Sequence, residues 1–177
     1  MEVFRTLRFR PVAREDLILL HAWLQQPHIR RWWIERRTYE EVEAHYLPAI
    51  EGREPTDHHL ALLGDEPIGF LQTYLVSDYP DYAALVGAGA GVAGVDLLIG
   101  DESRTGQGLG TEMLRRFVPE VVFAPPSTHA CLADPDSRNR ASIRAFEKAG
   151  FRSVREFHDP TWDEIHTLVW LDRADVP

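Results

Sequence analysis

Cysteine is nearly absent from this chain of 177 residues, in which Cys131 stands alone. A lone cysteine excludes an intramolecular disulfide and fits a reducing compartment, so we expect a cytoplasmic protein. Cys131 lies in an apolar run, and nothing evident would orient His129 beside it, so we expect a small core residue and not a nucleophile. No His/Cys cluster has zinc spacing, and no metal site is expected.

Long hydrophobic runs and excess positive charge are also missing. No apolar run approaches the roughly 20 residues of a membrane span, and Met1–Arg5 shows no signal-peptide core, so no membrane partner is expected. The 19 basic residues against 28 acidic ones give a net charge of −9. This balance argues against a nucleic-acid partner and favours a cationic small molecule, with simple solubility as the alternative.

The length suits one domain over residues 1–177, and the 44% apolar and 27% charged shares are ordinary for a globular protein. The alternation of strand-like and helix-like patterns predicts a mixed α/β fold whose neighbouring strands cannot all be parallel. Residues 77–91, rich in glycine, are expected to form a mobile loop beside the site. The expected strands are Thr6–Arg10, His59–Leu63, Ile68–Val76, Val92–Ile99, Thr128–Ala133, Phe151–Phe157 and Ile165–Leu171. The expected helices are Glu15–Gln25, one begun by a capping box at Thr38, one from Thr111 toward Phe123 and Ala141–Ala149. Pro119 is expected to kink or end the third of these helices.

A glycine-rich stretch, Arg104–Thr111, follows the apolar run Val92–Ile99 and opens a helix. Glycines at alternate positions leave backbone N–H groups unshielded at a helix N-terminus, which favours binding of an anion such as a phosphate. The stretch lacks the lysine of a Walker A loop, and its G-x-G-x-G spacing differs from the dinucleotide fingerprint. The alternative is a flexible glycine turn before an ordinary helix.

A second motif, Asn139–Phe151, reads N-R-A-S-I-R-A-F-E-K-A-G-F. Together with the glycine stretch it resembles the GNAT family of acetyl-coenzyme A-dependent N-acetyltransferases. The resemblance implies the GNAT fold, a mixed and mostly antiparallel sheet with splayed central strands, and acetyl-coenzyme A as acetyl donor. Thr105 stands where the family usually has Gln or Arg, and Asn139 either contacts the pantetheine arm or caps a helix. The cofactor-binding residues that the resemblance implies are Leu98, Ile99, Thr105, Gly106, Gln107, Gly108, Gly110, Thr111 and Asn139.

Asp96 is an ionisable residue within the apolar strand Val92–Ile99. Burial of an unpaired charge is costly, so the residue is either functional, exposed to water, or paired with an arginine. Its place beside the expected cofactor groove favours a catalytic role, in which it attracts the substrate ammonium and takes its proton. Asp134 ends the next strand, and Asp134-Pro135 could equally be a simple turn.

A narrower resemblance, to the aminoglycoside 6'-N-acetyltransferases, rests on motifs between about Leu7 and Phe151, including His28-Ile29-x-x-Trp32-Trp33, Gln72-x-Tyr74 and Gly94-x-Asp96. It implies that Asp134, Trp33, Gln72 and Tyr74 bind the substrate, Asp134 through an ammonium group. Core packing is the alternative for the tryptophans.

Two departures weaken the narrower resemblance. Ala83–Gly91 replaces an acidic, tryptophan-bearing loop of those enzymes, and Phe146 replaces a tyrosine thought to protonate the leaving thiolate. The sequence therefore predicts an N-acetyltransferase for a cationic amine, aminoglycosides first. The alternatives are acetylation of a hydroxylated lysine in siderophore assembly and a non-catalytic acyl-coenzyme A sensor. The sequence leaves a monomer or a homodimer open, and it does not identify the particular amine.

Overall fold

The computed structural model describes residues 6–33 and 38–176, so the expectation for Met1–Arg5 lies outside it. The chain divides into two compact units that are described separately. The first unit comprises Met1–Gln72 and Leu97–Gln107, and the second comprises Thr73–Asp96 and Gly108–Pro177.

The hydrogen-bonded strand order is β1-β2-β3-β4-β5-β7-β6. β4 and β5 run parallel, whereas β1–β2, β5–β7 and β6–β7 are antiparallel pairs. This order confirms the predicted mixed and mostly antiparallel sheet. None of the helices in the described part of the chain has both the length and the apolar character that a membrane crossing requires.

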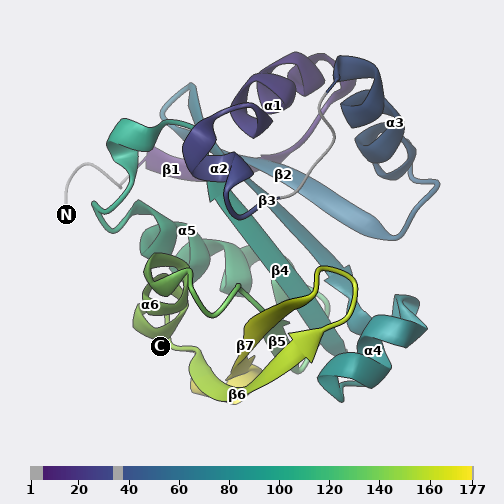
Figure 1. Cartoon of the computed structure of the whole chain (residues 1–177). Coiled ribbons are helices and arrows are strands. Elements are labelled where there is room, and N and C mark those ends of the chain that lie inside the picture. The colour runs from purple at the N-terminus through teal and green to yellow at the C-terminus, as the bar shows by residue number, and fades with distance from the viewer. Residues whose placement is uncertain (1–5, 34–37, 177) are drawn as a thin grey trace. The chain divides into compact units, whose positions relative to one another are not determined.

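In the first unit, α1 and α3 pack together, and α3 also packs against β2 (Figure 1). Their apolar faces enclose a core whose largest fully buried side chains include Tyr46, Phe70 and Leu20. Leu98 lies in this core, near the end of β4, the strand that precedes the glycine stretch. The elements are β1 (Leu7–Pro11), a 3-10 turn (Arg14–Asp16), α1 (Leu17–Leu24), α2 (Pro27–Arg30), α3 (Tyr39–Ile50), β2 (Thr56–Leu63), the first part of β3 (Glu66–Leu75) and the last part of β4 (Val92–Ile99).

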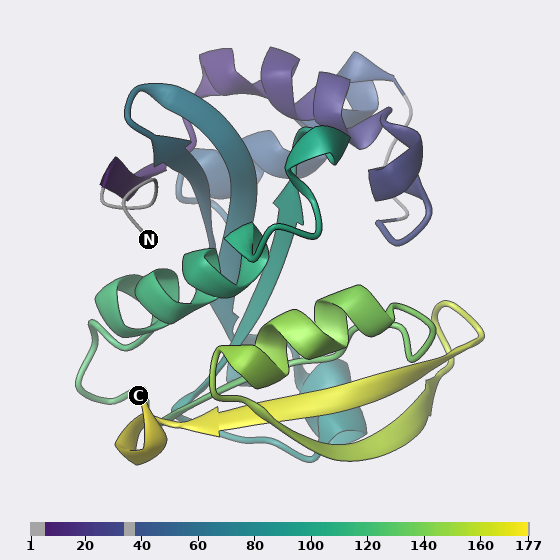
Figure 2. The same cartoon turned by 90° about the vertical axis from the view of Figure 1, so that its left-hand side faces the viewer.

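In the second unit, α6 packs on the hairpin of β6 and β7 and also against α5 (Figure 2). A separate core forms where Val86, Phe157 and Leu168 meet the buried residues of β5. The elements, besides the remainders of β3 and β4, are α4 (Pro80–Val86), α5 (Leu109–Phe117), a π-helical turn (Val118–Val122), β5 (Ala130–Ala133), α6 (Arg140–Lys148), β6 (Arg152–Asp159) and β7 (Glu164–Asp172).

The prediction of a loop over residues 77–91 was wrong for its first half. Pro80–Val86 is the helix α4, which has Pro80 in its first turn and ends at Gly87 with φ 71°. Proline fits a first helical turn and glycine fits the left-handed end, so both residues delimit a helix here. Val76, four residues before the helix, and Val86, its last residue, are both buried, which anchors the segment.

Two other boundaries differ from prediction. The connection after Pro27 contains the short helix α2, because Pro27 supplies a favourable first position. α5 begins at Leu109, two residues before the predicted start, since Gly108 is its N-cap. Pro119 lies in the π-helical turn where α5 ends, as predicted.

The predicted capping box at Thr38 is confirmed. The Glu41 N–H donates to Thr38 Oγ1 at 3.2 Å, and the Thr38 N–H donates to a Glu41 carboxylate oxygen at 2.9 Å. We expect Thr38→Ala to lower the free energy of unfolding by about 1 kcal/mol, because a first-turn N–H loses its acceptor. Thr38→Ser is the matched control and should retain most of that stability. Equal denaturation midpoints for the alanine and serine variants would show that the cap contributes nothing.

Candidate active site

The glycine stretch adopts the backbone that its composition predicts. Gly106 has φ 72° in the first unit, and Gly108 has φ 83° at the N-cap of α5. A Cβ at either position would meet no atom within 4 Å, so space is open beside the backbone. Gly110 and Thr111 follow in the first turn of α5. Positive φ strains any other residue at these two glycines, so their replacement costs folding energy as well as space.

Two side chains of the glycine stretch form hydrogen bonds to the backbone just before it. Thr105 Oγ1 donates to the Glu102 carbonyl at 2.7 Å, and Gln107 donates to the Ser103 carbonyl at 2.6 Å. Both predicted cofactor-binding residues therefore brace the turn, and backbone amides are left as the groups that could face a phosphate.

Arg104, displaced by one position from the family pattern, forms an ion pair with Glu66. One guanidinium nitrogen lies 2.7 Å from both carboxylate oxygens of Glu66. The pair joins the glycine stretch to the start of β3. The family usually has Gln or Arg at the position that Thr105 occupies here. The arginine of this chain lies one residue earlier, and its side chain is held by Glu66 within the first unit.

The end of β4 carries Leu98 and Ile99, which the family resemblance predicts to be cofactor-binding residues. His28 Nε2 lies 3.0 Å from the Ile99 carbonyl oxygen, so this nitrogen carries the proton and donates. Gly100 follows directly, and a Cβ there would lie 2.1 Å from the Trp23 indole. Contacts from α1 and α2 thus fix the end of the strand. The sequence analysis gave no role to His28 or Trp23.

Trp33 and Gln72 lie in the first unit beside its aromatic core. The ring of Trp33 meets Phe70 edge-on at 5.9 Å, which corresponds to the core-packing alternative. Burial lowers the pKa of His58 to about 4, the charges of neighbouring histidines add to this, and a hydrogen bond with Gln72 opposes it. Contacts of Trp33 or Gln72 with a sugar stay predictions.

Asp96 and Asp134 occupy equivalent places in the second unit. The parallel register of β4 and β5 ends at the pair Gly94↔Leu132. Asp96 lies two residues beyond that pair on β4, and Asp134 lies two residues beyond it, directly after the end of β5. The end of this register agrees with the predicted splay of the central strands, and it places both carboxylates at the same end of the paired segment.

Two tyrosines lie beside these carboxylates. Burial, then the negative charges of Asp96 and Asp134, raise the pKa of Tyr74 well above its usual value. Burial likewise raises the pKa of Tyr82. Both phenols therefore stay protonated and can act as donors. The Tyr74 ring covers Gly94 so closely that a Cβ there would lie 2.4 Å from it, so the glycine makes room for the ring.

Asp134 is held from two sides. Tyr82 donates its hydroxyl to one carboxylate oxygen at 2.5 Å, and His166 Nδ1 lies 3.0 Å from the other. One carboxylate oxygen each of Asp134 and Asp159 and one ring nitrogen of His166 all lie within 4.8 Å of one another. A positive charge placed among them would therefore be close to two carboxylates. The sequence analysis missed Tyr82, Asp159 and His166, because they come from α4, β6 and β7 and share no local motif.

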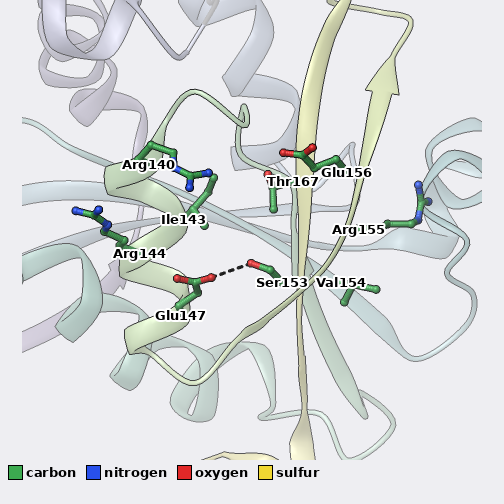
Figure 3. Close-up of a pocket in the computed structure, with 9 residues that line it drawn as sticks. All are labelled: Arg140, Ile143, Arg144, Glu147, Ser153, Val154, Arg155, Glu156 and Thr167. Atoms are coloured by element: carbon green, nitrogen blue, oxygen red, sulfur yellow. Dashed lines mark hydrogen bonds between the residues drawn. The ribbon is translucent and has the colours of Figure 1, made fainter.

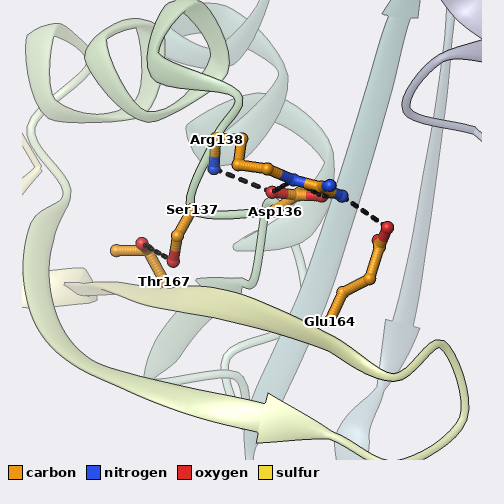
Figure 4. Close-up of polar contacts among 5 residues, drawn as sticks. All are labelled: Asp136, Ser137, Arg138, Glu164 and Thr167. Atoms are coloured by element: carbon orange, nitrogen blue, oxygen red, sulfur yellow. Dashed lines mark hydrogen bonds and ion pairs between the residues drawn. The ribbon is translucent and has the colours of Figure 1, made fainter.

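A polar network fixes the turn that follows Asp134 (Figure 4). Arg138 binds both Asp136 and Glu164, and the Ser137 and Thr167 hydroxyls share a hydrogen bond of 2.8 Å. The guanidinium of Arg138 holds the pKa of Asp136 at about 2. Asp136 is thus ionised throughout the neutral range.

An open pocket of about 370 Å³ lies elsewhere in the second unit, between α6 and the β6–β7 hairpin (Figure 3). Its rim includes Arg144 and Arg155, which extend to opposite sides, and a hydrogen bond from Ser153 to Glu147 crosses it at 2.9 Å. None of the predicted site residues lines it. Its polar groups do not converge on one point, so we assign it no role.

Three predicted residues have clear structural roles. Asn139 accepts the Ser142 N–H at 3.2 Å and caps α6, which supports the cap alternative and leaves a cofactor contact as a prediction. Phe146 is buried against Phe151 at 5.1 Å and offers no proton. Cys131 is fully buried, and burial raises the pKa of its thiol, which confirms the predicted core residue.

Comparisons with known proteins identify the family and the fold. The family model described as an acetyltransferase (GNAT) domain matches residues 12–159. The aminoglycoside N(6')-acetyltransferase type 1 of Klebsiella pneumoniae is 35% identical over 149 residues, 82% of this chain and 74% of that protein. The lysine N-acyltransferase MbtK of Mycobacterium tuberculosis is 29% identical over 154 residues, 82% of this chain and 68% of that protein.

Solved structures of aminoglycoside acetyltransferase AAC(6')-Ib share the fold at 31% identity. One, in complex with coenzyme A and kanamycin, superposes with a TM-score of 0.80 over 96% of each chain. Another, which contains acetyl-coenzyme A, gives 0.81 over 96% of this chain and 95% of that one. The family match over most of the length, together with a curated relative above 30% identity, shows that this chain belongs to the GNAT family of acetyltransferases.

Proposed function

We propose that this acetyltransferase moves the acetyl group of acetyl-coenzyme A to a primary amine of an aminoglycoside, the 6'-amino group. The observation that carries the proposal is the acidic group of the second unit: Asp96 and Asp134 each lie two residues beyond the last β4–β5 pair, beside two phenols that stay protonated. Such a group attracts a polycationic amine and offers both acceptors and donors to it. The aminoglycoside acetyltransferases among the relatives support the same substrate class.

The chemistry follows from what an amine near neutral pH requires. The amine is mostly protonated, so it must lose a proton before its nitrogen can attack the thioester carbon. Asp96 would draw in the ammonium and take that proton. The new C–N bond then forms, the C–S bond breaks, and coenzyme A leaves as a thiolate. A backbone N–H of Leu97–Ile99 would stabilise the oxyanion of the intermediate.

Proton donation to the leaving thiolate does not come from residue 146 in this protein, because Phe146 has no acidic group. A thiolate leaves adequately without an acid, so Phe146 does not prevent turnover. We further propose a cytoplasmic location, which the single buried thiol Cys131 supports. No oligomeric state is assigned.

Acylation of lysine or hydroxylysine is the second candidate, because the lysine N-acyltransferase relative covers as much of this chain as the aminoglycoside enzymes. Coenzyme A release from acetyl-coenzyme A, measured with kanamycin, lysine and hydroxylysine, separates the candidates. We expect the highest kcat/KM with kanamycin. A higher value with either lysine substrate would assign the second function, and no release with any amine would point to an acyl-coenzyme A sensor.

Gly108→Ala tests the glycine stretch. A Cβ there would fill the open space where a pyrophosphate would approach α5, so acetyl-coenzyme A affinity should fall strongly, by about tenfold or more. The positive φ adds a folding cost of about 1–2 kcal/mol. Gly64→Ala is the matched control, since Gly64 has φ 63° with no atom near its Cβ position and lies in the β2–β3 turn. It should lose similar stability and keep the wild-type dissociation constant by calorimetry. Equal affinities in the two variants would reject the phosphate role.

Asp96→Asn and Asp134→Asn distinguish proton transfer from binding. Asp96→Asn should lower kcat/KM for the amine by about 10²-fold or more, because a general base is lost, with little change for acetyl-coenzyme A. Asp134→Asn should mainly raise the amine KM and spare kcat, as expected when uniform binding is lost. Asp175→Asn, at an exposed site, is the control. Wild-type turnover of every accepted amine by Asp96→Asn would show that Asp96 is a bystander.

A further inference from the structure

His166 has no role in the mechanism described so far, yet it is the closest basic group to Asp134 in the described structure. Its Nδ1 lies 3.0 Å from Asp134 Oδ2, and each side chain is only 12% exposed. Water therefore screens this contact weakly.

The backbone fixes this pair of side chains. The Thr167 N–H donates to the Pro135 carbonyl at 2.9 Å, and the Ser137 N–H donates to the Ile165 carbonyl at 2.8 Å. These two hydrogen bonds flank His166 on β7 and bind the turn that starts at Asp134. The backbone thus holds the Asp134 carboxylate and the His166 imidazole facing each other.

The surroundings of His166 are mainly acidic. The pKa of His166 is raised, first by the hydrogen bond to Asp134, with burial opposing and the charges of Asp134, Asp159 and Asp136 adding to the rise. Asp134 and Asp136 face His166 from the turn, and Phe157 and Asp159 adjoin it from β6. Glu164 lies two residues away on β7 and binds Arg138, and Tyr82 of α4 contacts the same Asp134 carboxylate.

We propose that His166 is a positioning and specificity residue for the amine: it holds the Asp134 carboxylate in place, and its proton competes with a substrate ammonium for that carboxylate. The inference rests on the proposed function, in which Asp134 binds an ammonium group. An ionised carboxylate can only accept, so Nδ1 carries a hydrogen in both charge states of the ring. Loss of the second proton, from Nε2, leaves the hydrogen bond intact and removes the positive charge.

The direction of the pH effect follows. Below the raised pKa of His166 the imidazolium neutralises Asp134, so affinity for a polycation falls as the pH falls through that pKa. Above it Asp134 keeps its full charge toward the substrate. By linkage, a cation that binds at intermediate pH expels the imidazolium proton. The substrate's own amines gain charge at lower pH, which would strengthen binding, so their titration cannot imitate the effect.

Calorimetric titration with kanamycin, without acetyl-coenzyme A, measures this competition. Because the pKa of His166 is raised above the usual histidine value, the titration should run from about pH 8.5 down to about pH 5.5. Over this range we expect wild-type affinity to fall by about 5- to 150-fold, the usual range for coupled sites. Buffers of different ionisation enthalpy should show proton release on binding. His166→Asn places an amide N–H near the Nδ1 position, so it should bind as tightly as wild type at the higher pH and lose both the pH dependence and the proton release.

His158→Asn is the matched control, because His158 forms a similar pair with Asp163 at 2.8 Å on the exposed part of β6. It should keep the wild-type profile. His166→Ala, which loses the hydrogen bond, should bind more weakly throughout the range. A wild-type pH profile and proton release in His166→Asn would overturn the inference while leaving the proposed function intact. Absence of kanamycin binding by the wild type at every pH would overturn both.

An NMR titration of the His166 ring in the wild-type protein tests the inference without relying on the fold of any variant. Kanamycin should lower the pKa of His166, because the bound ammonium disfavours the imidazolium. A titration curve that kanamycin leaves unchanged would overturn the competition.

Discussion

The acidic group of the second unit depends on one constraint of packing, the close approach of the Tyr74 ring to the backbone at Gly94. Only a residue without a Cβ leaves room for the ring, and Thr73 donates its hydroxyl to the carbonyl of the same glycine at 2.9 Å. The tyrosine thereby lies beside the ends of β4 and β5, where Asp96 and Asp134 follow the last strand pair. This buried phenol beside two carboxylates is the basis of the proposal that the group binds a cation.

In the same unit, hydrogen bonds from several elements hold the negative charge of the Asp134 carboxylate in place. Asp134 receives donors from α4 and β7, and the turn after it is bound to β7 by backbone hydrogen bonds and by the Asp136–Arg138–Glu164 network. Each donor comes from an element that the core already orders. The conformational entropy of the Asp134 side chain is therefore lost when the protein folds, and little more of it is lost when a ligand binds.

Much of this could be predicted from the sequence where the signal was local. The strand Val92–Ile99 and the Thr38 capping box match the structure because a short apolar run and cap chemistry are both short-range signals. Helix α4 was missed because its small residues resemble a loop. Tyr82 and His166 were missed for a different reason: their meeting at Asp134 depends on tertiary packing of α4 and β7, which leaves no pattern in the neighbouring residues.

The central claim is that fixed carboxylates bind a polycationic amine, and its most direct test is the salt dependence of kanamycin binding. Salt screens the longer-range attraction between a polycation and the acidic group, even where a close contact is shielded from water, so the dissociation constant should rise from about 0.05 M to about 0.5 M NaCl. Asp134→Asn should show a shallower rise, since one of the charges is gone. A wild-type dissociation constant that does not change over this range of salt would contradict the account.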